Sequence, residues 1–135
     1  MRWKTQTRVR FAETDAAGIV HYAQYLGYLE AGRAEALRAV GFSSEMIADC
    51  GIHGRLLEAE IRYRAPAHFD ELLEIQAWIV EVFDSKFLFG YEIQRPADQA
   101  LIATAETLHE WTDDSVSASA RLPEWLLTAL DQLRA

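Results

Sequence analysis

The chain has 135 residues, of which half are hydrophobic and a quarter are charged, and its net charge at pH 7 is −8. This balance is typical of a globular domain and excludes a disordered chain, so we expect one domain spanning residues 1–135. No cluster of Lys and Arg resembles a nucleic-acid-binding face, so neither DNA nor RNA is an expected partner.

The sequence also bears on where the protein works. The lone cysteine, Cys50, excludes an intrachain disulfide and suits a reducing compartment. The first residues lack the apolar core of a signal peptide, and no apolar run is long enough to span a membrane. We therefore expect a cytoplasmic protein without a membrane partner.

The first half of the chain predicts a strand followed by a long helix. Residues 3–12 alternate with a period of two, which is typical of a half-buried strand. From Tyr22 to Val40, apolar residues recur at helical spacing on one face, and only Arg33 interrupts them. Gly41 then lies where a C-cap glycine belongs, so the helix has about 20 residues.

Shorter elements follow this helix. A short helix is predicted over 44–50, with Ser43 as its N-cap. Four strand-like runs come next, over residues 56–65, 72–83, 86–94 and 101–111. Tight turns are predicted at 84–85 and 96–99, and a short amphipathic helix closes the chain from Pro123 to Leu133.

The order of these elements predicts an α+β fold. Short connections between strands imply antiparallel neighbours, and the apolar stripe of the helix needs a sheet face to cover it. The simplest product is an antiparallel β-sheet wrapped around one long α-helix. Residues 72–83 are apolar on both faces, and Gly27 and Gly32 would allow close approach, so we also expect a partner subunit.

Several kinds of chemistry find no support. The four histidines are scattered without metal-ligand spacing, so no metal is expected. There is no nucleophile elbow around a serine and no glycine-rich phosphate loop, and no bound cofactor is implied.

The informative stretch lies between the first strand and the long helix. Asp15 precedes a helix N-terminus, where unpaired N–H groups can hold a developing oxyanion, and Gly18 leaves the backbone open to a ligand. Simpler interpretations exist for each residue. Asp15 could be a cap or turn residue, His21 a structural hydrogen-bonder, and Tyr22 and Tyr25 the buried face of the helix.

Two segments resemble the 4-hydroxybenzoyl-CoA thioesterase family. The first is residues 9–26, which read VRFAETDAAGIVHYAQYL, and the second is residues 63–72, which read YRAPAHFDEL. The resemblance implies a hotdog fold, a homodimer that often pairs into a homotetramer, and hydrolysis of acyl-CoA. It places the catalytic aspartate at Asp15 and the N–H that polarises the thioester near Tyr22. Gln24 stands where many members have Asn, which leaves the acyl group open.

Together these features predict an acyl-CoA thioesterase that converts acyl-CoA and water into a carboxylic acid and free coenzyme A. Asp15 would be its nucleophile or general base. The residues expected to bind the oxyanion and substrate are Gly18, His21, Tyr22 and Tyr25. Those expected to contact the CoA phosphates are Arg62, Arg64 and Lys86. The alternatives are a thioesterase acting on acyl-carrier protein, a catalytically silent acyl-CoA-binding module and a purely structural oligomer subunit.

Overall fold

The computed structural model describes residues 1–42, 45, 52–113, 118–119 and 121–135. In these residues one antiparallel sheet has the order β1-β3-β4-β5-β2, with β6 beside β5. Its strands are β1 (Trp3–Arg8), β2 (Ile52–Tyr63), β3 (Leu72–Phe83), β4 (Lys86–Arg95), β5 (Ala100–Asp113) and β6 (Ala118–Ser119). The helices are η1 (Phe11–Glu13), η2 (Tyr22–Gln24), α1 (Tyr25–Ala39) and α3 (Glu124–Asp131). None of these helices is long and apolar enough to cross a membrane.

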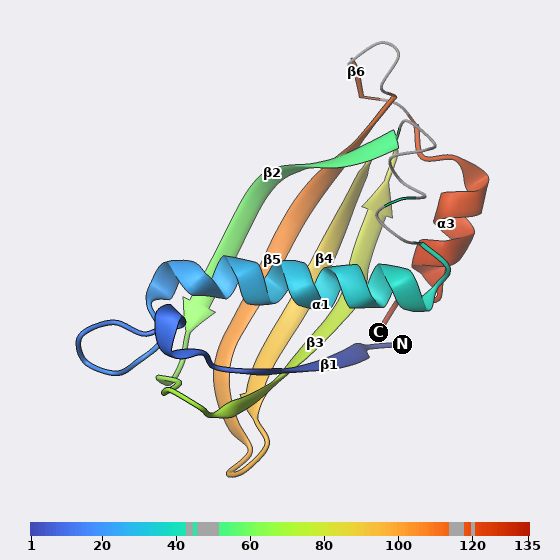
Figure 1. Cartoon of the computed structure of the whole chain (residues 1–135). Coiled ribbons are helices and arrows are strands. Elements are labelled where there is room, and N and C mark those ends of the chain that lie inside the picture. Colours follow the sequence, from blue (N-terminus) through green and yellow to red (C-terminus); the bar gives the residue numbers. More distant parts are fainter. Residues whose placement is uncertain (43–44, 46–51, 114–117, 120) are drawn as a thin grey trace.

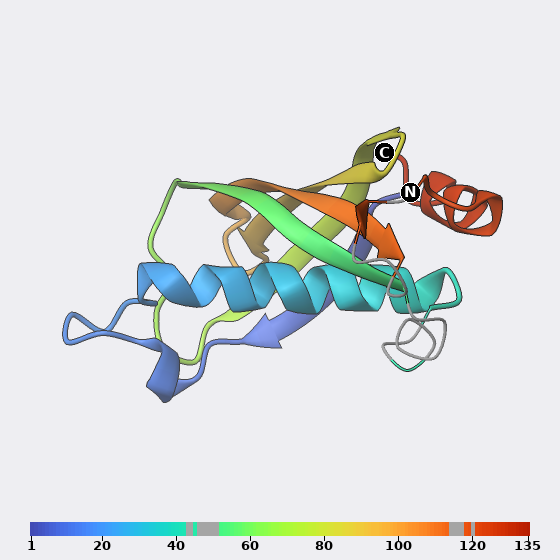
Figure 2. The same cartoon turned by 90° about the horizontal axis from the view of Figure 1, so that it is seen from above.

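The helix α1 lies across one face of the sheet, and α3 lies beside one end of it (Figure 1; Figure 2). The side of α1 toward the sheet carries Tyr25, Tyr28, Leu29, Gly32 and Ala36, all buried. Gly32 is required there, because a Cβ atom would lie only 2.6 Å from Cγ2 of Ile75 on β3. The antiparallel sheet around one long helix, predicted from the sequence, is confirmed.

The helix differs in detail from its prediction. It has 15 residues, because Tyr22–Gln24 form a 3-10 turn and α1 begins only at Tyr25. Tyr22 and Leu26, expected on the buried stripe, are exposed. Arg33 is half-buried and donates a hydrogen bond of 3.1 Å to the hydroxyl of Tyr91, so its polar group is satisfied inside the stripe.

The strand predicted over 86–94 provides the centre of the core. Phe87, Phe89, Tyr91 and Ile93 all point toward α1 and are buried, as their alternation predicts. Burying each such side chain stabilises the fold by about 1.5–3 kcal/mol. The turn at Asp84 is also confirmed, since Phe83 pairs with Lys86 across it.

The expectation that both faces of 72–83 are apolar is wrong for Val82. A β-bulge between Ile79 and Glu81 inserts one residue, so Val82 turns inward and packs against the core. On the outer face of the sheet, Trp78 lies half-buried among polar neighbours such as Gln76 and Glu92. Nor does Gly32 support a subunit contact, because it serves packing within the chain.

Two other expectations concern the ends of strands. The alternation over 3–12 holds only through Arg8, and Phe11 enters η1 with 76% of its surface exposed. On the edge strand β2, Leu57 and Tyr63 are exposed, whereas Ile61 packs against the core, and Leu57 lies at a β-bulge between Leu56 and Glu58. The short helix predicted over 44–50, together with its cap Ser43, and Cys50 lie outside the described residues.

Candidate active site

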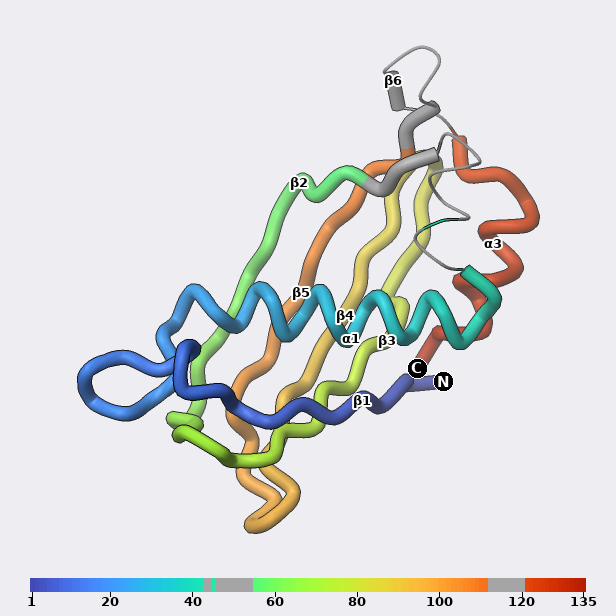
Figure 3. The backbone as a smooth tube through the Cα atoms, in the orientation of Figure 1, coloured from blue at the N-terminus to red at the C-terminus, as the bar shows by residue number. Residues whose placement is uncertain are grey.

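Residues 14–21, here called the Asp15 loop, form a small hairpin that precedes η2 and α1. Thr14 pairs with Val20, and the N–H of Asp15 donates to the carbonyl oxygen of Ile19 at 2.8 Å. Gly18 has a φ of +79°, a conformation that favours glycine, so its role in the turn is conformational. The hairpin projects beyond the sheet, near the end of β2 (Figure 1; Figure 3).

The carboxylate of Asp15 has two oxygens in different situations. Oδ1 accepts the N–H groups of Ala17 at 2.8 Å and Ile19 at 3.4 Å, which is the cap-like turn that local pattern predicts. For Oδ2, the described residues provide no hydrogen-bond donor. The side chain is exposed, so one oxygen holds the turn while the other stays without a donor among the described residues.

The backbone N–H groups of this region are nearly all engaged. Those of Gly18, Val20 and His21 donate to the carbonyl oxygens of Asp15, Ala67 and Glu13. The N–H groups of Ala17 and Ile19 donate to Asp15 Oδ1. The N–H of Ala23 donates to Nδ1 of His21, and the N–H of Gln24 donates to the carbonyl oxygen of His21. In the part of the chain that the structure describes, no acceptor takes the N–H of Tyr22, the first residue of η2.

His21 serves as the N-cap of η2. Its Nδ1 accepts the N–H of Ala23 at 3.2 Å, and its ring stacks on that of Tyr22 with centroids 4.3 Å apart. The structural interpretation of His21 fits this geometry better than a catalytic one, because Nδ1 is occupied in holding the turn.

A pocket of about 380 Å³ opens beside Asp15. Its walls include the aromatic side chains of Tyr22, Tyr25 and Tyr63, together with Arg64. The Tyr25 ring packs edge-to-face on Tyr63 with centroids 5.1 Å apart, and burial raises the pKa of Tyr25. Tyr63 was not among the site residues predicted from the sequence, because only pairing of β2 with β5 brings it to the loop.

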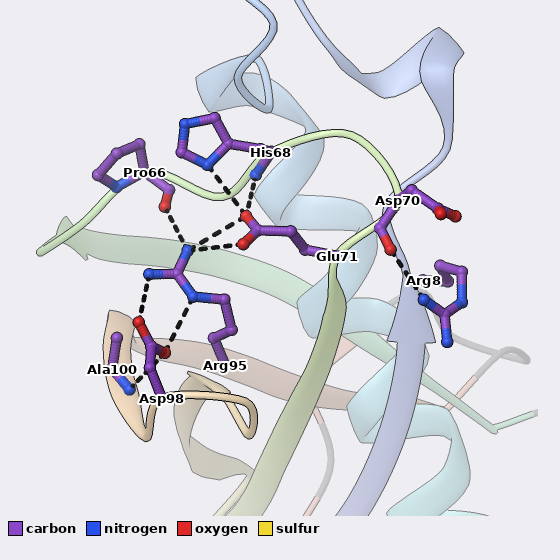
Figure 4. A network of polar contacts seen from close by, with 8 residues as sticks. All are labelled: Arg8, Pro66, His68, Asp70, Glu71, Arg95, Asp98 and Ala100. Atoms are coloured by element: carbon purple, nitrogen blue, oxygen red, sulfur yellow. Dashed lines mark hydrogen bonds and ion pairs between the residues drawn. The ribbon is translucent and has the colours of Figure 1, made fainter.

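The segment 64–71, after β2, packs against the Asp15 loop and supplies part of the pocket wall. Ile19 pairs with His68, and the N–H of Val20 donates to Ala67. Figure 4 shows the polar contacts that hold this segment. Arg95 of β4 donates to the carbonyl oxygen of Pro66 and to the carboxylate of Glu71, both at 3.1 Å, and also pairs with Asp98.

The charge of Glu71 is stabilised inside this network. Burial acts to raise its pKa, but hydrogen bonds from His68 and the nearby Arg95 outweigh burial and hold the pKa below its usual value. Arg95 is firmly cationic, because Asp98 and Glu71 raise its pKa. The network therefore stays charged at neutral pH and braces the segment against the Asp15 loop.

The predicted phosphate contacts are only partly brought together. Arg62 on β2 and Arg64 just after it both line an outer hollow of about 320 Å³, and Arg64 also borders the Asp15 pocket. Arg62 is paired with Glu60 at 2.9 Å. Lys86 lies six positions from Glu92 on β4, roughly 20 Å along the strand from the level of Arg62, so it does not join them.

An antiparallel sheet wrapped around one helix, with a carboxylate loop at the start of that helix, defines a hotdog-fold protein. The family model described as the thioesterase-like superfamily matches residues 9–130. The chain belongs to this superfamily, and the predicted hotdog fold is thereby confirmed.

The relatives carry thioesterase names. The Escherichia coli acyl-CoA thioester hydrolase YbgC is 30% identical over 97% of this chain and 96% of its own. The 1,4-dihydroxy-2-naphthoyl-CoA hydrolase of Synechococcus elongatus is 28% identical over 96% and 98% of the two chains. The crystal structure of Slr0204, a 1,4-dihydroxy-2-naphthoyl-CoA thioesterase from Synechocystis, superposes with a TM-score of 0.90, at 28% identity and 98% coverage of each chain.

Proposed function

We propose that this chain hydrolyses acyl-CoA thioesters to a carboxylic acid and free coenzyme A. One observation carries the site assignment: Asp15, whose Oδ2 has no donor among the described residues, and Tyr22, whose N–H has no acceptor among them, line the same pocket. A base or nucleophile beside a hydrogen-bond donor is the minimum that thioester hydrolysis requires. The thioesterase names of the relatives support the activity.

In this mechanism the N–H of Tyr22 donates a hydrogen bond to the thioester carbonyl oxygen and stabilises the negative charge that develops there as the acyl carbon becomes tetrahedral. Asp15 either removes a proton from the attacking water or attacks the acyl carbon itself and forms an anhydride. On the first route, the activated water adds to the acyl carbon and the C–S bond breaks, giving the acid directly. On the second route, C–S cleavage is the step that forms the anhydride, and water then hydrolyses the anhydride to the acid and restores the Asp15 carboxylate. On both routes the thiolate of coenzyme A leaves and is protonated. Both roles of Asp15 fit an exposed carboxylate.

The walls of the pocket bear on substrate binding. Tyr22, Tyr25 and Tyr63 offer aromatic surface for an aryl or short acyl group next to Asp15. Arg64 stands at the junction of this pocket and the outer hollow, so it is the first candidate for a phosphate contact, and Arg62 is the second. Because Arg62 is already paired with Glu60, its contribution should be the smaller.

We further propose a homodimer, which two such dimers could extend to a homotetramer. β2 pairs with β5 on one side, and its other side has no strand partner within the described residues. This edge carries exposed apolar residues, including Leu56 and Leu57, and it ends at Tyr63 in the pocket wall. A long apolar edge strand is normally covered, and a second copy would cover it beside the site. The cytoplasmic location stays a prediction.

Thiol release tests the function directly. The purified protein is given aromatic, short-chain and long-chain acyl-CoAs, an acyl-carrier protein thioester and an oxygen ester matched to the best thioester. We expect release of coenzyme A from at least one acyl-CoA and slow cleavage of the ester. Binding of acyl-CoA without thiol release would support the silent module instead. Preference for the carrier protein would move the substrate to that class, and no binding at all would leave a structural subunit.

A further inference from the structure

A second carboxylate, two residues before Asp15, is buried beneath the Asp15 loop. Only 9% of Glu13 is exposed, and it is the last residue of η1, directly before the Asp15 loop. Its Oε1 accepts the N–H of Arg10 at 2.8 Å and the hydroxyl of Tyr28 at 2.9 Å. Its Oε2 lies 3.3 Å from both Nε and an Nη of the Arg10 guanidinium. Glu13 cannot reach the pocket as a catalyst while these groups hold it.

These contacts tie the root of the loop to α1. Tyr28 is buried on the face of α1 that packs on the sheet, so its hydroxyl is a fixed point. The carbonyl oxygen of Glu13 accepts the N–H of His21 at 2.9 Å, which closes the hairpin one residue before Tyr22. Glu13 therefore connects the helix, the start of the loop and its end.

The charge of Glu13 makes this connection strong. Burial acts to raise its pKa, but the hydrogen bonds from the Arg10 N–H, from Tyr28 and from the Arg10 side chain together lower the pKa below its usual value. Tyr28 responds in the opposite direction, since burial and the neighbouring carboxylate raise its pKa and keep its hydroxyl a donor. A buried carboxylate without these partners would be costly, so the arrangement resists displacement.

We infer that Glu13 and Tyr28 are positioning residues for the hydrolysis proposed above: they set the distance between the Asp15 carboxylate and the Tyr22 N–H without touching substrate. The inference rests on the proposed function. It follows from geometry, since Asp15 and Tyr22 lie at opposite ends of a loop whose closure at Glu13 and His21 depends on Glu13.

The main test compares two buried tyrosines. Tyr28→Phe removes the hydroxyl that holds Glu13, whereas Tyr91→Phe removes a buried hydroxyl bonded to Thr107 and Arg33, away from the loop. For Tyr28→Phe we expect kcat to fall about tenfold with KM within about twofold, the pattern of a lost transition-state interaction. For Tyr91→Phe we expect kcat within about twofold of the wild type, although its melting temperature also falls.

Amide hydrogen exchange gives a readout that does not need activity. The N–H groups of Asp15 and His21 close the loop, so Tyr28→Phe should speed their exchange about fivefold or more, while Tyr91→Phe should leave it unchanged. Glu13→Gln keeps the shape but sets an amide NH₂ against the Arg10 guanidinium, so it should lose more kcat than Tyr28→Phe. If the Glu13→Gln variant does not fold, the Tyr28→Phe variant still tests the positioning role.

The outcomes separate the two hypotheses. An active wild type with kcat unchanged in Tyr28→Phe, or with an equal loss in Tyr91→Phe, overturns the positioning role alone. A wild type that releases no thiol from any substrate overturns the proposed function. In that case, unchanged amide exchange at Asp15 and His21 in Tyr28→Phe would also overturn the claim that Tyr28 holds the Asp15 loop closed.

Discussion

The hydroxyl of Tyr63, at the end of the edge strand β2, donates a hydrogen bond of 2.9 Å to the backbone carbonyl oxygen of Tyr22. This bond joins two segments that are 41 residues apart in the chain and that both line the Asp15 pocket. It ties η2 to the end of β2. This hydrogen bond thus connects the proposed dimer edge to the candidate site.

Removing this bond should weaken catalysis modestly. Tyr63→Phe deletes only the hydroxyl, and a single hydrogen bond is worth about 0.5–1.5 kcal/mol, so kcat/KM should fall by about two- to tenfold. Tyr63→Ala also removes the aromatic wall and should raise KM further. The measurement is steady-state thiol release by both variants. Equal kinetics for Tyr63→Phe and the wild type would mean that the bond does not serve the site.

Asp15→Asn should abolish catalysis and leave the fold intact. The amide keeps a carbonyl oxygen for the N–H groups of Ala17 and Ile19, but it is neither a base nor a nucleophile. We expect kcat to fall by about 10²–10⁴-fold, with an unchanged melting temperature. Asp15→Ala is the matched comparison, because it loses the turn as well and should also melt lower. A folded Asp15→Asn variant with more than about a tenth of wild-type kcat would exclude Asp15 from the reaction.

Arg95→Met should loosen the wall made by the segment 64–71. Arg95 has only 16% of its side chain exposed and holds the carbonyl oxygen of Pro66 as well as Glu71 and Asp98. We expect a loss of about 1–2 kcal/mol in the free energy of unfolding, together with lower kcat. Arg134→Met is the control: Arg134 pairs with Asp131 at 2.7 Å in a similar i,i+3 contact, but away from the loop. Urea unfolding of both variants should separate them, and equal losses would contradict the bracing role.

Stability should fall at acidic pH because of His109. Burial, and then the nearby Arg33 guanidinium, lower the pKa of His109 to about 3, so it is neutral in the native protein. The unfolded chain takes up a proton below about pH 6.5, so unfolding gains protons between about pH 6.5 and 3, and stability is lost as pH falls through this window. At pH 5, 1.5 units below 6.5, this group should cost about 2 kcal/mol relative to pH 7.5.

The check on this pH effect is urea unfolding at pH 7.5 and pH 5. His109→Gln removes the titrating group and keeps a polar side chain beside Thr107, whose hydroxyl lies 2.8 Å from the His109 ring. The variant should be less stable at pH 7.5 but should lose less on acidification. An identical pH dependence in the variant would show that other groups are responsible.

The oligomeric state should be at least a dimer. The chain mass is 15.3 kDa, so light scattering at micromolar concentration should give twice this mass or more. Leu57→Lys places a charge on the exposed edge strand, where it should weaken association and thiol release together. Leu127→Lys, on the exposed side of α3, is the control and should leave both unchanged. A 15.3 kDa wild-type species with full activity would contradict the proposal.

The sequence by itself determined the features that depend on neighbours along the chain. The period of two in β4, the glycine at position 41 with its φ of +104° and the turn at Asp84 each follow from a few adjacent residues. The stretch from Glu13 to Tyr22 was also recognisable, because its residues carry the family signature in register. Local pattern was enough to place a carboxylate before a helix N-terminus.

Only the tertiary structure decided which groups meet. The bulge after Ile79 turned Val82 inward, and Leu57, at the bulge between Leu56 and Glu58, is exposed. Tyr63 entered the pocket and Glu13 gained Tyr28 through contacts between distant segments. The physical reason is that periodicity fixes the direction of a side chain relative to its own strand or helix. Strand order, bulges and partners depend instead on how separate segments bury their surfaces against one another.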